Sequence, residues 1–406
     1  MASIEVDLRS SRVPAIVFGE GVTALGVVRA LRSHDIPTYL VAPRRALAAR
    51  SREIVVLSSG WSTSRSADGL RSFLATTDLD QGVLVPCEDD WATAVSDLGD
   101  RDVGPFKSSM PPSSVVRRFL DKGDFARMLE ELDIERPRTF EIRSAKDLGQ
   151  IDDDELTSFF LKPRDSQRFV RQFHRKALTL TERGQATRDV ERALDGGHQL
   201  VAQELVSGPP RNHVFIDGFV DRHGHFVGLL ARRRIRMFPP RFGNSTDTAT
   251  VPLTDAADAI DSVRRLFSGI GYRGMFDAEF KRDGATGRHK IIEVNVRPWW
   301  QIELARAAGI DVVYMAYMDA LGIDVEPVHG YRIGRRWVHT LPDLRARLEG
   351  PRGLRPDATQ EGWFSARHAV FRWSDPRPGL AEIARVARVA IDLGIRRLSR
   401  RDMPSG

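Results

Sequence analysis

Short apolar runs that stop at glycine, proline or charged residues dominate the first hundred positions, a pattern typical of buried parallel strands. These runs predict strands at residues 13–19, 36–41, 53–57 and 82–86. Residues 22–33 place apolar side chains at helical spacing, which completes a β-α-β unit. We therefore expect residues 1–112 to form an open α/β domain that ends at the glycine and proline cluster from Gly104 to Pro112.

The middle of the chain changes to a mixed pattern. Helical spacing over residues 115–133 gives way to short strands, expected at 138–142, 159–162 and 200–205. From residue 213, two-residue alternation predicts antiparallel hairpins, with strands at 213–220, 226–237, 274–281 and 289–297. A helix is expected over residues 255–270. We divide this α+β region into subdomains at residues 113–204 and 205–325.

Residues 326–406 are expected to form a C-terminal extension that finishes in a basic helix over 380–401. Ile383 and Val386 lie on one face of this helix, together with Val389 and Leu393. We expect this face to pack into a core. A helix that lies on a membrane surface or binds a partner is the alternative.

Composition places the chain among ordinary globular proteins, since 41% of its 406 residues are hydrophobic and 29% are charged. No run reaches the roughly 18 apolar residues of a membrane span, and the first residues do not resemble a signal peptide. A cytoplasmic location without stable membrane insertion is expected. The single cysteine, Cys87, excludes an intramolecular disulfide and a cysteine-clustered metal site. The net charge of +6 comes from 61 basic and 55 acidic residues, too small an excess to indicate a nucleic-acid partner.

The strands expected at 274–281 and 289–297 each carry a polar face. The two-residue period puts Asp277 and Glu279 together on one strand, and Glu293, Asn295 and Arg297 together on the other. If the strands pair across their turn, Glu279 lies close to Glu293 and Asp277 close to Asn295. Like charges placed opposite one another are destabilising, so a cation is needed. Mg²⁺ suits this set, because it takes carboxylate oxygens together with substrate phosphates.

Three further features precede this hairpin in a fixed order. Lys122 stands at the head of a helix, Lys162 ends a strand 40 residues later, and residues 203–206 (Gln-Glu-Leu-Val) follow after another 41 residues. The ordered set, with the acidic hairpin, resembles the ATP-grasp superfamily of carboxylate-amine ligases over residues 115–310. The Lys-Pro after a strand and the Asn-x-Arg-Pro-Trp sequence look most similar to the group that contains D-aspartate ligase.

The resemblance implies a role for each matching position. Lys122 and Lys162 are expected to contact ATP phosphates, and Lys176 is a further candidate. The segment Gln203, Glu204, Leu205 and Val206 is expected to be the hinge that contacts the adenine. The expected ligands of Mg²⁺ (or Mn²⁺) are Glu279, Glu293 and Asn295. Arg297 is expected to hold the acyl phosphate or the acceptor.

Arginines form a second polar row. Arg232, Arg234 and Arg236 share one face of a strand, and we predict that they bind phosphate or carboxylate groups beside the hairpin, with Arg236 as a catalytic residue. A solvated strand face is the alternative.

The chain departs from the superfamily after Lys162, where residues 163–169 contain no glycine to cover phosphates. Arg164, Arg168, Arg171 or Lys176 are candidates to replace the missing backbone amides. This departure motivates one alternative function, a catalytically inactive scaffold that binds nucleotide.

A glycine turn near the N-terminus motivates a second alternative function. Residues 19–24 fit G-x-G-x-x-A between a strand and a helix, which is typical of dinucleotide binding, and Arg44 is placed to meet the 2′-phosphate of NADP in an oxidoreductase. We favour a role for this turn in an acceptor or carboxylate pocket.

The predicted function is therefore ATP- and Mg²⁺-dependent joining of a carboxylate to an amine through an acyl phosphate. The expected partners are a small-molecule acid and an amine, an amino acid or a peptide. The resemblance also suggests a homodimer.

Overall fold

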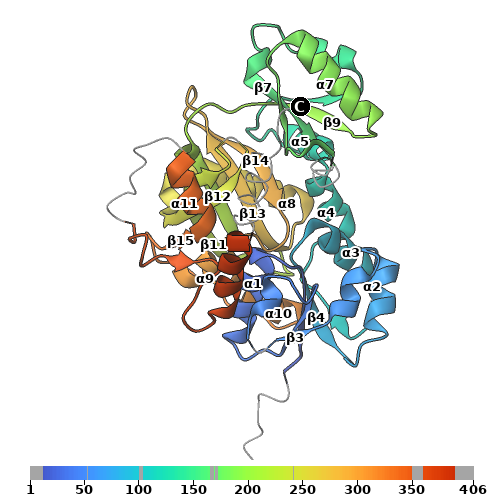
Figure 1. Ribbon diagram of the computed structural model, residues 1–406, viewed down its shortest axis with the longest axis vertical. Helices are drawn as coiled ribbons and strands as arrows, with labels where there is room; N and C mark the ends of the chain where they lie inside the picture. Colours follow the sequence, from blue (N-terminus) through green and yellow to red (C-terminus); the bar gives the residue numbers. More distant parts are fainter. Residues whose placement is uncertain are drawn as a thin grey trace, which may run out of the picture.

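The computed structural model describes residues 12–52, 54–99, 104–164, 169, 172–240, 242–349 and 360–388. Three β-sheets organise this part of the chain (Figure 1). The sheet nearest the N-terminus is parallel, in the order β3-β2-β1-β4-β5. Its strands are β1 (Ala15–Phe18), β2 (Thr38–Val41), β3 (Val55–Val56), β4 (Gly82–Pro86) and β5 (Phe106–Lys107). Its helices are α1 (Val22–Arg32), α2 (Ala67–Leu74) and α3 (Asp89–Gly99). The predicted α/β pattern is confirmed here.

The smallest sheet is antiparallel and has the order β6-β9-β7-β8. Its strands are β6 (Thr139–Ile142), β7 (Phe159–Pro163), β8 (Leu178–Thr179) and β9 (Leu200–Glu204), and α7 (Arg183–Asp195) packs on it. This small lobe has its own apolar core, which includes Leu161, Phe169 and Val190. Figure 1 shows it at the top, set apart from the rest of the molecule.

The largest sheet has seven strands in the order β14-β13-β10-β11-β12-β15-β16. Its strands are β10 (His213–Val220), β11 (Phe226–Phe238), β12 (Asn244–Val251), β13 (Gly274–Arg282), β14 (His289–Asn295), β15 (Arg336–Val338) and β16 (Arg367–His368). One face is apolar and buries Phe276, Ala278 and Phe280 under α4 (Ser113–Leu120), α5 (Lys122–Glu131) and α8 (Ala257–Ile270). The opposite face carries the alternating polar residues, as the two-residue period predicts. The hairpin is followed by α9 (Ile302–Ala308), α10 (Val312–Ala320) and α11 (Thr340–Glu349).

The C-terminal extension is part of the large sheet, since β15 pairs with β12 and β16 pairs with β15. The strand β12 was not predicted, because its sequence, NSTDTATV, lacks apolar alternation. It is nevertheless buried, with Asp247 fully inaccessible. Bidentate pairing with Arg336 satisfies that carboxylate, through Nε to Oδ1 at 2.8 Å and Nη2 to Oδ2 at 2.5 Å.

The final helix spans residues 377–388 within the described chain. We expected its apolar face to pack into a core, and for residues 383–388 this is wrong, because every one of them is exposed. Its predicted continuation to residue 401 lies outside the described residues. Within the described chain, no helix is long and apolar enough to cross a membrane.

Candidate active site

The carboxylate hairpin forms with the predicted register. In the antiparallel pair β13 and β14, Asp277 lies opposite Asn295 and Glu279 lies opposite Glu293. The turn that joins the strands is held by Asp283, which accepts from Ala285 N at 2.8 Å and Ser207 Oγ at 3.1 Å. The two-residue period and the turn thus bring three acidic residues and an amide to one patch of the polar face.

Two lysines from separate elements converge on Glu293. Lys122 Nζ lies 4.0 Å from Glu293 Oε1, and Lys162 Nζ lies 3.9 Å from Oε2. Lys122 is placed by the start of α5, where Asp121 accepts from Gly123 N and Asp124 N, each at 2.9 Å. Burial lowers the pKa of Lys162, although Glu293 acts in the opposite direction. The ammonium groups of Lys122 and Lys162 therefore lie on either side of the exposed carboxylate of Glu293.

Glu279 lies deeper and contacts Arg234 and His213, which belong to other strands of the large sheet. Its Oε1 accepts from Arg234 Nη2 at 2.8 Å and lies 2.7 Å from His213 Nδ1. Burial acts to raise the pKa of Glu279, but Arg234 and His213 outweigh it and hold this pKa far below the ordinary value. Glu279 is therefore ionised at neutral pH and keeps Oε2 as an oxygen donor.

The pKa of His213 predicts how the free energy of unfolding depends on pH. Burial, followed by the charge of Arg234, lowers its pKa from 6.5 to about 4. The unfolded chain therefore binds a proton near pH 6.5 that the folded chain does not bind until about pH 4, so stability falls as the pH falls through this window. Between about pH 6.5 and 5, we expect the free energy of unfolding of the wild type to fall by about 1.5 kcal/mol more than that of His213→Gln. Urea titrations measure both. Equal losses in the two proteins would contradict this assignment.

The donor set fits a hard divalent cation that is shared with phosphates. Asn295 Nδ2 donates to Asp277 Oδ2 at 3.1 Å, which leaves Asn295 Oδ1 as its acceptor atom. Glu293 and Glu279 supply carboxylate oxygens beside it. Among the described residues there is no group of three or more His, Cys, Asp or Glu side chains that would hold a metal alone. Two carboxylates and one amide suit Mg²⁺, which usually takes its other ligands from water and substrate phosphates.

The predicted hinge joins the small lobe to the large sheet. Glu204 Oε2 accepts from Arg138 N at 3.0 Å and from Lys290 Nζ at 3.4 Å. The backbone of the next two residues is also engaged: Leu205 N donates to Ser158 O at 2.6 Å, and Val206 O accepts from Lys281 Nζ at 2.7 Å. These contacts hold residues 204–206, where the chain passes from the small lobe to the large sheet, against both parts.

A narrow cavity of about 20 Å³ lies between the two lobes, and Gln203, Lys122, Lys162 and Glu293 are among its lining residues. A volume of this size holds about one water molecule, so side chains or lobes must move before a nucleotide enters. A wider cleft of about 900 Å³ lies next to it, but most of its arginines are ion-paired, as in Arg138 with Glu155 at 2.9 Å. We place the candidate site in the narrow cavity because it contains both lysines.

Arg297 connects the hairpin to the N-terminal sheet. Its Nε donates to Asp89 Oδ1 at 2.5 Å, at the start of α3. Burial acts to raise the pKa of Asp89, but the contact with Arg297 lowers it below its ordinary value. The predicted glycine turn lies close by, where Glu20 N donates to Glu88 Oε1 at 3.3 Å. A carboxylate at that turn disfavours the pyrophosphate of a dinucleotide.

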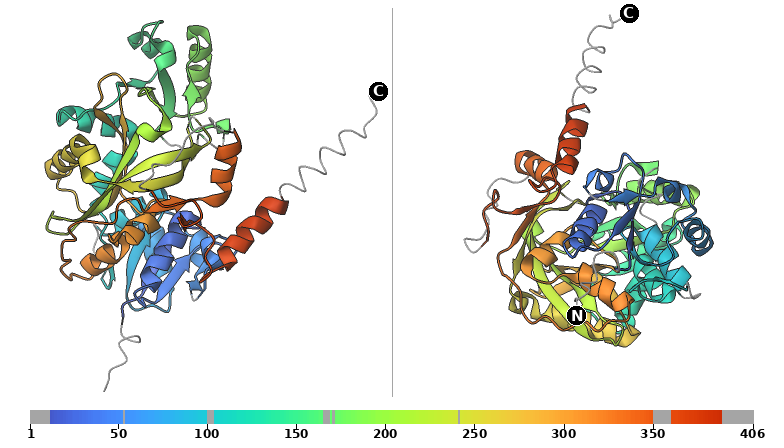
Figure 2. Two further views of the ribbon diagram at one scale, coloured as in Figure 1. Left: turned by 90° about the vertical axis from the view of Figure 1, so that its left-hand side faces the viewer. Right: turned by 90° about the horizontal axis from the view of Figure 1, so that it is seen from below.

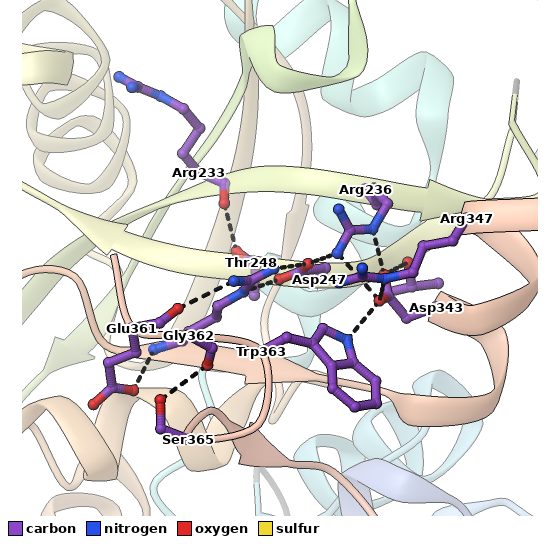
Figure 3. A network of polar contacts seen from close by, with 12 residues as sticks. Arg233, Arg236, Asp247, Thr248, Asp343, Arg347, Glu361, Gly362, Trp363 and Ser365 are labelled. Atoms are coloured by element: carbon purple, nitrogen blue, oxygen red, sulfur yellow. Dashed lines mark hydrogen bonds and ion pairs between the residues drawn. The ribbon is translucent and has the colours of Figure 1, made fainter. Parts of the chain in front are cut away.

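The arginine row does share one face of β11, but its members are bound by carboxylates of the chain itself. Arg232 has no exposed surface and donates to Asp217 Oδ2 at 2.6 Å and Asp277 Oδ1 at 2.7 Å. Arg236 is also buried and contacts Asp247 and Asp343, the latter at 2.8 Å (Figure 3). The guanidinium of Arg236 is thus satisfied inside the fold, and a contact between Arg236 and a reactant stays a prediction.

Lys176 also lies apart from the other two lysines. Its Nζ donates to Asn244 Oδ1 at 3.1 Å, so it bridges the small lobe and β12. Arg164 contacts Asp121 rather than the cavity. Arg168, Arg171 and most of the glycine-free loop lie outside the described residues. How phosphates are covered therefore stays a prediction.

No family model matches this chain. A D-aspartate ligase of Enterococcus faecium is 24% identical over 228 residues, which cover 53% of this chain and 53% of that enzyme. The alignment thus spans about half the length of the curated relative.

Solved structures match over a longer part of the chain. The ATP-analogue complex of biotin carboxylase from Campylobacter jejuni matches with a TM-score of 0.63 at 13% identity, covering 80% of this chain and 75% of that one. The biotin carboxylase domain dimer of Hydrogenobacter thermophilus 2-oxoglutarate carboxylase, in complex with MgADP, ADP and bicarbonate, also has a TM-score of 0.63. It is 14% identical and covers 80% of this chain and 74% of that one. The chain therefore has the ATP-grasp fold, as the resemblance implied.

Proposed function

We propose that this ATP-grasp chain is an ATP- and Mg²⁺-dependent ligase that joins a carboxylate to an amine. One observation carries the proposal: Lys122 and Lys162 approach Glu293 to 4.0 and 3.9 Å, beside Glu279 and Asn295. A site with two phosphate-binding cations next to a carboxylate and amide set is suited to the triphosphate of ATP with a bound cation. The structural relatives that were solved with an ATP analogue, ADP or MgADP support the same ligands.

The proposed reaction has two steps. A carboxylate oxygen of the acid attacks the γ-phosphorus of ATP, the bond to the leaving ADP oxygen breaks, and an acyl phosphate forms. The nitrogen of the amine then attacks the acyl carbon, the bond to the phosphate oxygen breaks, and the nitrogen loses a proton to give an amide. Neither step needs a nucleophile from the protein, so positioning and charge neutralisation supply the catalysis.

Each side chain of the cluster has a proposed role in this reaction. Lys122 and Lys162 hold phosphate oxygens as compact positive charges. Glu279, Glu293 and Asn295 would hold Mg²⁺, which neutralises charge on the phosphates when bound. Arg297 lies at the junction with the N-terminal sheet, where it is placed to steady an anionic acid or acyl phosphate.

We propose amino acids or peptides as the substrates. The similarity to a D-aspartate ligase supports an amino acid, and the region beside Arg297 offers both charges that an amino acid needs. Arg297 is suited to a carboxylate, and Asp89 is suited to an ammonium group. A homodimer, like the domain dimer of the 2-oxoglutarate carboxylase, stays a prediction for this chain.

Thermal unfolding tests the proposed ligands. ATP with Mg²⁺ should raise the melting temperature more than either does alone, because a ligand that binds the folded state stabilises it by mass action. NADPH should give no shift, since Glu88 occupies the glycine turn. A shift with NADPH alone would overturn the proposal in favour of an oxidoreductase.

Turnover is tested next, by ADP release in a screen of amino acids and amines. Release that requires both an acid and an amine is the expected result. Strong ATP binding with no ADP release across the screen would instead favour an inactive nucleotide-binding scaffold.

A further inference from the structure

The helix over residues 377–388 projects away from the body of the protein, as both views of Figure 2 show in red. Large apolar side chains on and before it are exposed to solvent: Trp373 at 90%, Leu380 at 58%, Ile383 at 54% and Val386 at 41%. The last three recur every third residue and therefore share one side of the helix. No described residue of the chain covers this side, although burying it would be favourable.

The direction of the helix is fixed at its base. Asp375 is buried and accepts from Arg29 Nε at 3.1 Å and from Ser51 Oγ at 2.8 Å, which ties it to the N-terminal sheet region. One turn into the helix, Glu382 is buried against His339, with 2.9 Å between Oε1 and Nε2. The helix is thus held out from the body by two buried polar anchors.

The side opposite the apolar residues is basic. Arg385 and Arg388 are exposed there, at helical positions that face away from Ile383 and Val386. The sequence from 377 to 401 carries seven arginines and two acidic residues, an excess of five in a chain whose formal net charge is +6. Most of the net positive charge of the protein is therefore concentrated in this one segment.

We propose that this helix docks the protein on an anionic phospholipid surface. A helix with an apolar side, a basic polar side and an aromatic residue at its edge lies in the interface of a bilayer, with its apolar residues at the boundary of the acyl chains. Trp373, Leu380 and Ile383 would enter that boundary, while Arg385 and Arg388 would contact lipid phosphates. The inference does not depend on the proposed ligase activity.

The charge favours a membrane over a second copy of the chain. If two helices paired through Ile383 and Val386, Arg385 and Arg388 would lie on the outer sides of the pair, and the partner helix would leave their charges without an anion. An anionic surface instead neutralises them and also covers the apolar side.

Flotation of the full chain with lipid vesicles tests the proposal. We expect the protein to float with vesicles of phosphatidylcholine and phosphatidylglycerol in a seven-to-three ratio, and to stay behind with pure phosphatidylcholine. Binding should weaken at high salt, because screening shortens the reach of the arginine charges. A wild-type protein that does not float with the mixed vesicles would overturn the proposal.

Two double variants separate the contributions of the helix. Ile383→Asp with Val386→Asp should abolish flotation, whereas Arg385→Gln with Arg388→Gln should weaken it about 20- to 30-fold, given the contribution of each arginine near an anionic surface. The matched control is Arg143→Gln with Arg188→Gln, which removes the same charge from side chains that are 82% and 64% exposed elsewhere. This control should bind within about twofold of the wild type if the location of the charge decides binding.

Light scattering tests whether a second copy of the chain, and not a membrane, covers the apolar side of the helix. If the wild type is a dimer, does not bind vesicles, and becomes monomeric in the Ile383→Asp, Val386→Asp variant, then a second copy covers the helix and the proposal fails. Equal melting temperatures of all variants would show that the folded body is intact.

Discussion

The Glu293→Gln variant should lose ATP turnover by about two to three orders of magnitude while its fold stays intact. Glutamine keeps the size of the side chain but removes the negative charge that faces Lys122 and Lys162. The side chain is 43% exposed, so its replacement leaves no buried cavity. Without this charge, the site would no longer hold a divalent cation beside the phosphates. The measurement is ADP release at saturating acid and amine, together with the melting temperature.

Glu191→Gln is the matched control, because it makes the same change on the exposed surface of α7, at a residue that is not among those lining the narrow cavity. It should turn over at the wild-type rate. If Glu293→Gln retained more than about a tenth of the wild-type turnover, the loss would be less than that of one transition-state contact, and the metal assignment would fail.

The Arg232→Ala variant should lose about 3–5 kcal/mol of unfolding free energy, the largest stability effect that we expect from one substitution. Arg232 has no exposed surface, and its two ion pairs hold Asp217 and Asp277 at the centre of the large sheet. Burial raises the pKa of Asp217 well above its ordinary value even with the arginine present. Removing the guanidinium leaves two buried carboxylates side by side without a cation. Urea unfolding followed by tryptophan fluorescence measures the loss.

Arg233, which follows Arg232 in the sequence, supplies the control. Arg233 points to the opposite face and pairs with Asp255 at 3.0 Å, with about a third of each side chain exposed. Arg233→Ala should cost less than about 1 kcal/mol, as exposed ion pairs usually do. Adding Asp217→Asn to Arg232→Ala should recover part of the stability, since it removes one of the unpaired charges. Similar losses at positions 232 and 233 would contradict the buried network.

Local patterns predicted the parts of the structure that depend on neighbours in the sequence. The pairing of Glu279 with Glu293 follows from a two-residue period and a short turn, so the register could be worked out from the sequence alone. The parallel sheet follows in the same way from apolar runs and a glycine turn. The approach of Lys122 to Lys162 came only from the family resemblance, because their elements are far apart in the chain.

The contacts that the sequence did not predict join residues that lie far apart in the chain. Arg236 looked free in the sequence, yet Asp343, 107 positions later, accepts its hydrogen bond. No local signal reports such a pairing. The contact of Glu279 with His213 was missed for the same reason, since His213 belongs to another strand of the sheet. The strand β12 was missed because its burial rests on charge compensation rather than apolar alternation.

The position of β15 beside β12 has a consequence for synthesis on the ribosome. Asp247 is made 89 residues before Arg336, the partner that holds both of its oxygens. Until β15 emerges, β12 is an unprotected sheet edge whose central carboxylate contacts Arg236 but lacks its bidentate partner. The large sheet can therefore reach its final form only late in translation. A nascent chain stalled before residue 336 should be digested by protease within β12, and one released after residue 388 should not.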